Sequence, residues 1–266
     1  MLKLVAQNKY KLMAFIIGLY LLVDVLQHKG QTRLLFRKSF PEVKQQTQFP
    51  QSMSILINKD KTWKKAVNTK EQMNELNPDI KGFECDIYFD TASARSFDVH
   101  HDPGKSIGYS LDDLLQLYRQ KNLQASIWLD IKNLDDLTAP VILQSLIELR
   151  NKYQLHNKIL VESSRADLLT AFSDSGFYTS YYTPMFNPYQ MDDAALISRA
   201  DSISAVLKNS RVNALSGYYF QYPFLHHCFA NYPLLIWVAN DRFSLVNWLF
   251  KRKIARSKAV FIALYP

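Results

Sequence analysis

Two predicted β-strands near the middle of the chain carry carboxylates at a spacing that suits chemistry. The strand GFECDIYF holds Glu84 and Asp86 two positions apart, and the strand ASIWLDI holds Asp130 near its end, with Lys132 two residues later. Side chains two apart on a strand point to the same face, whereas the apolar residues between them point to the other. Each strand therefore presents its charged side chains together.

Three carboxylates that converge on one place repel one another unless a cation or protons neutralise them. Oxygen ligands suit a hard divalent ion, Mg²⁺ or Ca²⁺, better than they suit zinc. We therefore expect Glu84, Asp86 and Asp130 to hold a divalent cation, Ca²⁺ or Mg²⁺. The alternative is a salt-bridge network in which Lys132 and Lys65 compensate the acidic side chains.

A histidine pair lies in the long connection between these two strands. In the sequence DVHHDP, His101 follows Asp86 by fifteen residues, and His100 directly precedes it. A histidine beside a metal-bound phosphate can donate or accept a proton near neutral pH. The alternative is a pair of surface histidines without a chemical role.

The elements that must position these residues follow a repeating pattern of strand and helix. Eight strands are predicted, at residues 62–68, 82–89, 125–131, 158–163, 177–183, 214–220, 234–240 and 259–265. Helical patterns separate most of them, at residues 69–76, 111–120, 138–153, 165–172, 192–207 and 243–255. Ser110 and the acidic residues after it are a typical helix start.

This alternation predicts an α/β fold, a (β/α)8 TIM barrel, because strands separated by helices form parallel crossover units and eight of them close a ring. In such a barrel the active site lies at the carboxyl ends of the strands. A doubly wound open sheet is the alternative. It would have a glycine-rich first turn, and none of the seven glycines forms one.

Composition limits the possible partners. Hydrophobic residues make up 48% of the 266 residues, which predicts a packed globular body rather than a disordered chain. The net charge of +8 is spread along the chain without a dense Lys/Arg run, so we expect no nucleic-acid partner. Anionic lipid headgroups or a phosphate-bearing substrate suit this charge better. The two cysteines, Cys85 and Cys228, have no metal-ligand spacing.

The N-terminal segment differs from the rest of the chain. Lys3, Lys9 and Lys11 precede the apolar run LMAFIIGLYLLV, and no small-x-small cleavage site follows it. We therefore expect an uncleaved membrane anchor at residues 1–27. A buried or interfacial helix is the alternative, because the run is short for a full span.

A polar linker at residues 28–56 and the barrel at residues 57–266 follow the predicted anchor. Basic residues flank the anchor on both sides, so charge does not set its orientation. The expected location is a bacterial inner membrane, with the barrel facing the periplasm.

The ordered motifs resemble a known family. Glu84-Cys-Asp86, His101-Asp102 and Asp130-Ile-Lys132 are similar to the core pattern of the glycerophosphodiester phosphodiesterases, within the superfamily of phospholipase C-like barrels. IWVAND and FIALYP resemble that family's seventh-strand and closing segments, so that the resemblance covers about residues 59–266. The segments WKKAVNT and WLDIKN are more similar to the menorin-like branch of this family.

The resemblance implies a role for the acidic and histidine residues. Glu84, Asp86 and Asp130 would hold the divalent ion, with Asp130 in place of the usual glutamate. His101 would be the general acid or base that serves the leaving oxygen. His100 is the fallback, because register within a loop is open.

Three further residues acquire expected roles in substrate binding. Lys132 would bind a phosphoryl oxygen, and Asn68 would contribute to the substrate site. Trp237 would form part of the substrate wall, with a place in the core as the alternative.

The chain also departs from the family pattern. Lys65 stands where the family's first strand ends in a catalytic histidine, and Ala263-Leu264 replaces a closing aspartate. Lysine is a poor base at neutral pH unless its pKa is strongly lowered, so Lys65 is expected either to act as a catalytic residue with a lowered pKa or to clamp the phosphate.

Three functional hypotheses follow from these residues. The leading one is a membrane-anchored, metal-dependent phosphodiester hydrolase acting on a glycerophosphodiester, a phospholipid headgroup or a related envelope phosphodiester. The second is a catalytically impaired barrel that binds a phosphorylated ligand or lipid without turnover, which Lys65 favours. The third is a glycosidase using paired carboxylates without a metal.

Overall fold

The computed structural model describes residues 2–27, 39–43, 61–91, 96–238 and 244–266. These residues divide into two compact units. One unit comprises Phe40–Ala239 with Lys258–Pro266, and the other comprises Met1–Ser39 with Asn240–Ser257. Most of the predicted linker, residues 28–56, lies outside the described residues, and the predicted domain boundaries stay a prediction.

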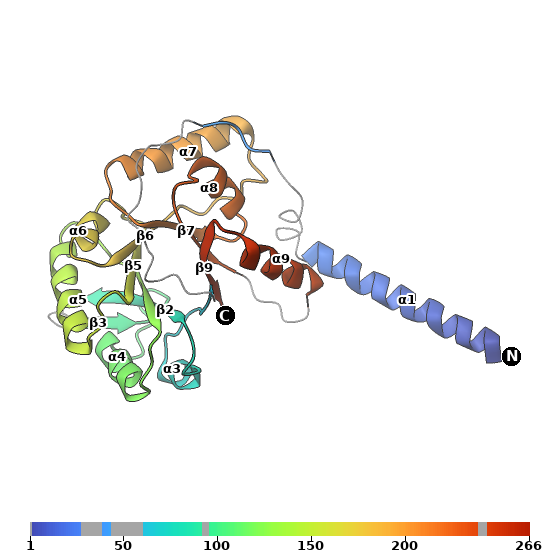
Figure 1. The fold of residues 1–266 in the computed structure, drawn as a ribbon, viewed down its shortest axis with the longest axis horizontal. Coiled ribbons are helices and arrows are strands. Elements are labelled where there is room, and N and C mark those ends of the chain that lie inside the picture. The colour runs from blue at the N-terminus through green and yellow to red at the C-terminus, as the bar shows by residue number, and fades with distance from the viewer. Residues whose placement is uncertain (1, 28–38, 44–60, 92–95, 239–243) are drawn as a thin grey trace. The chain divides into compact units, whose positions relative to one another are not determined.

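The larger unit is a closed barrel of eight parallel strands, which confirms the predicted (β/α)8 fold (Figure 1). The strands are β1 (Thr62–Lys64), β2 (Gly82–Asp90), β4 (Ser126–Ile131), β5 (Ile159–Ser163), β6 (Tyr178–Tyr182), β7 (Ala214–Tyr218), β8 (Leu234–Trp237) and β9 (Val260–Tyr265). Each pairs with the next along the chain, and β1 closes the ring by pairing with both β9 and β2. All eight predicted strands are present, with shorter bounds for several.

One strand was not predicted. β3 (Ser96–Val99) pairs antiparallel with the carboxyl-terminal half of β2 and lies outside the parallel ring. It carries the chain directly from the barrel rim to His100. The histidine connection is therefore held by a β-ribbon rather than by a free loop.

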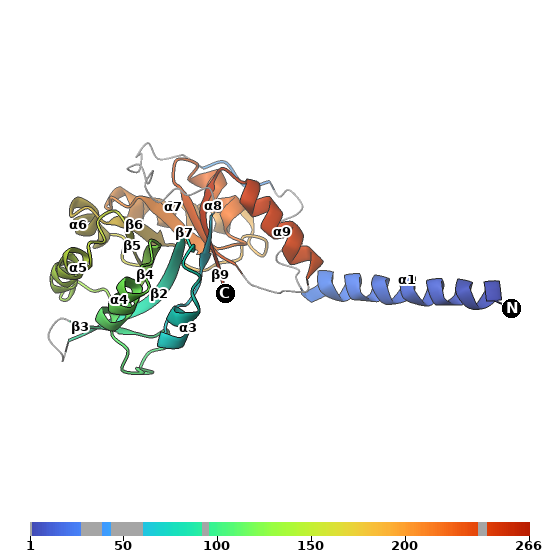
Figure 2. The same cartoon turned by 60° about the horizontal axis from the view of Figure 1, so that its bottom comes forward.

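Helices surround this ring of strands, as Figures 1 and 2 show. They are α3 (Lys70–Glu75), α4 (Leu111–Gln120), α5 (Ala139–Tyr153), α6 (Leu169–Asp174), α7 (Asp193–Lys208) and α8 (Tyr222–Cys228). The predicted start of α4 is confirmed, because Ser110 accepts a hydrogen bond from the Asp113 backbone and Asp113 reaches back in a capping box. α8 was not predicted, since its seven residues are too few and too aromatic for a clear helical period.

Large side chains fill the barrel interior. The buried cluster consists of Trp63, Trp128, Leu160, Ala214, Leu235, Trp237, Ile262 and Leu264. Gly82 is required by this packing, because a Cβ there would lie 2.1 Å from the Trp63 indole. The apolar interior gives way to polar side chains toward the carboxyl ends of β2 and β4, where Asp86 and Asp130 lie.

The smaller unit contains α1 (Leu2–Gln27) and α9 (Leu245–Arg256). Within α1, the 19 residues Lys9–Gln27 have a mean hydropathy of 1.6 and are long and apolar enough to cross a membrane. Only 6% of that window is buried, and a signal sequence near the N-terminus meets the same criteria of length and hydropathy. The helix is longer than the predicted apolar run, since it begins at Leu2.

Candidate metal-binding active site

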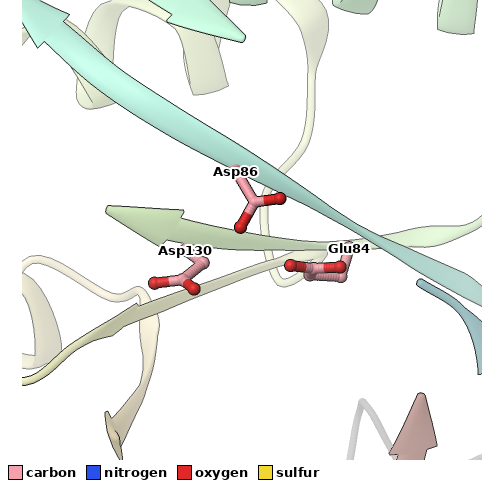
Figure 3. Close-up of side chains that lie close together, drawn as sticks. All are labelled: Glu84, Asp86 and Asp130. Carbon is pink, nitrogen blue, oxygen red and sulfur yellow. The ribbon is translucent and has the colours of Figure 1, made fainter. Parts of the chain in front are cut away.

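Three carboxylates meet on the inner face of the barrel, as Figure 3 shows. Glu84 and Asp86 come from β2, and Asp130 comes from the adjacent β4, where it is the register partner of Asp86. One oxygen of each carboxylate lies within 4.8 Å of the other two. All three side chains are buried, with residue exposures of 2%, 1% and 6%. The structure thus brings together the residues that the sequence assigned to a metal site.

The backbone after β1 holds Glu84. The Ala66 N–H donates a hydrogen bond of 2.6 Å to Glu84 Oε2, and Ala66 has a φ of +55°, in the left-handed region that favours glycine. This strained turn aims the N–H into the barrel. Burial, followed by the charge of Asp86, raises the pKa of Glu84 to about 8.

Asn68 holds Asp86 through two hydrogen bonds. Its Nδ2 donates to Asp86 Oδ2 at 2.6 Å, and its Oδ1 accepts from the Asp86 backbone N–H at 2.9 Å. Both ends of the Asn68 amide are therefore committed to Asp86. Asn68 thus supports Asp86, a predicted metal ligand, and the role predicted for Asn68 in substrate binding stays a prediction.

Lys132 lies beside the cluster on the chain just beyond β4. Its Nζ lies 2.6 Å from Asp86 Oδ1 and also pairs with Asp130 Oδ2. Attraction by these two carboxylates raises the pKa of Lys132, although burial opposes the rise. Its single positive charge offsets one of the three carboxylates. A divalent cation would offset the other two, which is the charge that a metal at this place requires.

A fourth carboxylate was missed by the sequence analysis. Glu162 on β5 is the register partner of Asp130 and is fully buried. Neither of its oxygens forms a hydrogen bond of normal geometry with a described residue. Burial, then the charge of Asp130, raises the pKa of Glu162, although the Ser216 hydroxyl opposes the rise. The signal in the sequence was the single acidic residue in KILVES, which lacks a second carboxylate two positions away.

The residues present therefore fit a divalent cation. The three clustered carboxylates supply hard oxygen ligands, and the buried carboxyl group of Glu162 lies on the neighbouring strand in register with Asp130. Lys65 does not compensate the acidic cluster. Its side chain is half-buried and forms no ion pair with a described acidic residue, while its backbone N–H donates to the Tyr265 carbonyl at 2.7 Å.

The two histidines have different surroundings. His100 is buried and stacks on Tyr88 with ring centroids 4.3 Å apart, and its Nδ1 lies 2.8 Å from the Asp102 carbonyl. His101 is exposed, and its Nδ1 lies 2.8 Å from Asp102 Oδ1. Burial raises the pKa of Asp130, and the ammonium group of Lys132 opposes that rise.

The Asp102 carboxylate orients His101. The pKa of Asp102 is lowered to about 2 by Lys105 and then by His101, so this side chain is ionised throughout the neutral range. A carboxylate on Nδ1 favours the tautomer in which that nitrogen carries the proton. The Nε2 atom of His101 is then left to accept or donate a proton elsewhere.

Aromatic side chains from β4, β6, β7 and β8 gather in the barrel interior. The Trp237 ring lies 4.6 Å from that of Tyr182 and 6.0 Å from that of Trp128, and Trp237 itself is 7% exposed. Tyr182 and Tyr218 are only partly buried against this cluster. Burial raises the pKa of Tyr182 to about 12, and the charges of Asp130 and Lys132 act on it as well.

Comparisons with known proteins add the fold relationship. No protein-family model matches the sequence, and no curated protein is found as a relative. A solved glycerophosphodiester phosphodiesterase from Parabacteroides distasonis matches 78% of this chain and 93% of its own, with 12% identity and a TM-score of 0.51. An Oleispira antarctica phosphodiesterase, solved in complex with the product sn-glycerol-3-phosphate, matches 80% of this chain and 95% of its own, with 11% identity and a TM-score of 0.52. At these identities the chain shares the barrel fold of both enzymes.

Proposed function

We propose that this chain is a divalent-metal-dependent phosphodiester hydrolase. The observation that carries the proposal is the meeting of Glu84, Asp86 and Asp130 around one place with less compensating charge than they require. The fold shared with phosphodiesterases supports the same reaction class. Within that superfamily, the segments WKKAVNT and WLDIKN support a position near the menorin-like branch.

Glu84, Asp86 and Asp130 would hold the ion, which would be Ca²⁺ or Mg²⁺. When bound, such an ion polarises a phosphoryl group and offsets the charge that develops on its oxygens. Lys132 lies at the edge of this cluster and would turn its ammonium group from the carboxylates to a phosphoryl oxygen. Asn68 would keep Asp86 in place throughout.

His101 would move the proton. An oxygen nucleophile, either water or a hydroxyl of the substrate, attacks phosphorus while the bond from phosphorus to the leaving oxygen breaks. His101 Nε2 would take the proton from the nucleophile and return it to the leaving oxygen, which balances the reaction. Lys65 would stand at the position of the family's second histidine, so that one histidine would serve both transfers. His100 would act in its place only if its stacking on Tyr88 were released.

The substrate class that we propose is a glycerophosphodiester, a phospholipid headgroup or a related envelope phosphodiester. The partly buried tyrosines Tyr182 and Tyr218, beside Trp237, would contact the apolar part of such a molecule. The product bound by the Oleispira antarctica enzyme is a glycerol phosphate, which supports this class. The helix α1 would anchor the chain in a membrane, and we propose a bacterial inner membrane with the barrel in the periplasm.

Hydrolysis of bis-p-nitrophenyl phosphate and glycerophosphocholine, with added Ca²⁺ or Mg²⁺ and with chelator, tests the proposal. We expect metal-dependent turnover that is lost in Glu84→Ala and in His101→Ala. Asp136→Ala, an exposed acidic residue beyond β4, is the matched control and should keep full activity. Turnover that persists in chelator would contradict the proposal.

We also propose a second function, which the family resemblance at Lys65 favours. If Lys65 stands in place of a proton carrier, the barrel would bind a phosphorylated ligand or lipid through the same acidic site without turning it over. Metal binding together with complete inactivity on both substrates, and saturable binding of sn-glycerol-3-phosphate, would support this second function over the first.

A further inference from the structure

The smaller unit of the chain contains a helix end that is fixed to the apolar helix α1. Asp24 is the carboxylate that interrupts the apolar stretch of α1, and it is only 4% exposed. Its Oδ2 accepts a hydrogen bond of 3.0 Å from the backbone N–H of Val246, in the first turn of α9. Ser244 caps the same turn by accepting from the Asn247 N–H at 2.9 Å. A negative charge at a helix start is favoured by the helix dipole, so α9 begins at a defined place on α1.

The helix α9 presents two different faces. Its buried face consists of Val246, Asn247, Phe250 and Ile254. Its exposed face follows the i, i+3, i+4, i+7 spacing and consists of Leu245, Trp248, Leu249, Arg252 and Arg256. The three large apolar side chains on that face are exposed by 43%, 49% and 39%. The exposed face is therefore apolar in its first half and basic in its second.

The positive charge of α9 indicates that an anionic surface covers its exposed face. No acidic residue occurs in α9, whereas four of its last six residues are basic. The guanidinium of Arg252 lies 4.7 Å from the centre of the Trp248 ring, which places a cation beside the exposed indole. Tryptophan and arginine together with exposed leucines are the side chains of helices that lie at the boundary between lipid headgroups and acyl chains.

The attachment at Asp24 sets the depth of this face. Asp24 lies three residues before Gln27, where the apolar stretch ends, which corresponds to about 5 Å along the helix. A helix tied there lies at the edge of any bilayer that Lys9–Gln27 crosses. We propose that α9 lies in the headgroup layer of that membrane, with Leu245, Trp248 and Leu249 toward the acyl chains and Arg252 and Arg256 on anionic phosphate headgroups. The proposal rests on the insertion of α1 and adds a second, lipid-selective contact.

The four tryptophans of the chain, all within the described residues, allow a direct test. Trp63, Trp128 and Trp237 are at most 7% exposed in the barrel interior, whereas Trp248 is 49% exposed. The full-length protein is reconstituted in vesicles of phosphatidylcholine with phosphatidylglycerol, brominated on the acyl chains near the glycerol. We expect the bromine atoms to quench Trp248 fluorescence and to leave the other three unchanged. Trp248→Phe should remove the quenching.

Two pairs of variants separate the attachment and the charge. Asp24→Leu removes the acceptor for the Val246 N–H and should abolish the quenching, whereas Asp24→Asn keeps an acceptor and should preserve it. Arg252→Gln with Arg256→Gln should lower the partition of α9 onto anionic vesicles by roughly fivefold per arginine. Lys70→Gln with Arg119→Gln, two exposed cations of the barrel unit, is the charge-matched control and should have no effect.

Flotation of the vesicles distinguishes the two proposals. Protein that floats while Trp248 is quenched by aqueous acrylamide and not by brominated lipid leaves the α1 anchor standing and overturns the α9 contact. Protein in which Trp248 is shielded from both quenchers has α9 covered by protein, which also overturns the lipid contact. Protein that does not float overturns both.

Discussion

The Nζ atom of Lys132 lies 2.6 Å from Oδ1 of Asp86, on the edge of the space that the three carboxylates share. The ammonium group of Lys132 and a divalent ion would therefore compete for the same carboxylate oxygens. A cation that binds there has to share Asp86 with Lys132 or displace it toward a ligand. This competition makes the lysine a measurable reporter of the site.

Lys132→Met removes the competing charge. We expect divalent ions to bind about tenfold more tightly to this variant, because the carboxylates lose their only described ammonium partner. Hydrolysis should fall by roughly 10²-fold, because the variant lacks the proposed contact with a phosphoryl oxygen. Isothermal titration with Mg²⁺ and Ca²⁺, together with kcat, measures both effects. Lys208→Met, an exposed lysine at the end of α7, is the control. Weaker metal binding in Lys132→Met would favour the salt-bridge network over a metal site.

The raised pKa of Glu84 makes the stability of the metal-free protein depend on pH. The pKa rises from 4.5 to about 8 on folding, so the folded chain holds more protons than the unfolded chain between these values. Its stability contribution is therefore complete below pH 4.5, falls as pH rises to about 8, and then levels off. The slope from this one group is at most about 1.4 kcal/mol per pH unit.

Urea unfolding in chelator across this pH range measures the slope, and Glu84→Gln should reduce it. Added Mg²⁺ or Ca²⁺ should reduce it too, because the ion takes the place of the proton. An identical slope in wild type and Glu84→Gln, both in chelator, would show that this carboxylate is already ionised in the folded chain.

Asn68→Ala should weaken metal binding by about 10- to 100-fold, since the variant releases both hydrogen bonds that orient Asp86. Calorimetric titration measures the affinity, and thermal unfolding in chelator measures the fold separately. Asn151→Ala, an exposed asparagine on α5, provides the comparison. An unchanged metal affinity in Asn68→Ala would return this residue to its predicted role in substrate binding.

Lys65→His introduces an imidazole directly after β1. If the site lacks one proton carrier, turnover should increase by roughly 10² to 10⁴. The pH profile should then gain a second ionisation near neutrality. Lys65→Gln, which removes the charge without adding a base, separates this gain from simple loss of the lysine. A Lys65→His variant no more active than Lys65→Gln would show that a single histidine suffices.

Gly82→Ala tests the packing below the site. The added methyl group would lie 2.1 Å from the Trp63 indole, so the buried ring has to move, and we expect a loss of about 1–3 kcal/mol in unfolding free energy. Trp63→Phe should relieve much of that loss, which a double-mutant cycle in urea measures as coupling. Additive effects of the two changes would contradict the contact.

Much of the barrel could be predicted because its signals are local. Strand residues point alternately to the barrel interior and to the surrounding helices. Glu84 and Asp86 therefore mark the inward-facing residues of β2, and Asp130 marks those of β4. β3 and α8 escaped prediction because each is too short to show a period, and their conformations depend on packing against β2 and on the aromatic core.

The site was predictable where charged residues stand two positions apart, as Glu84 does from Asp86 and Asp130 does from Lys132. Glu162 has no charged residue two positions away and is aligned with Asp130 only through the register of β5 with β4, which no local pattern encodes. Asn68 acts on Asp86 through a turn whose left-handed residue is Ala66 rather than a glycine, so the sequence carries no sign of the turn. Both depend on contacts between distant segments.

The turn at Ala66 also links the acidic cluster to the opposite end of the barrel sequence. The neighbouring Lys65 N–H is held by the carbonyl of Tyr265 on β9, and the next N–H along the chain is the one that supports Glu84. A nascent chain that has not yet docked β9 thus has its carboxylates without the backbone clamp that organises them. Ion binding would therefore accompany closure of the ring by β9.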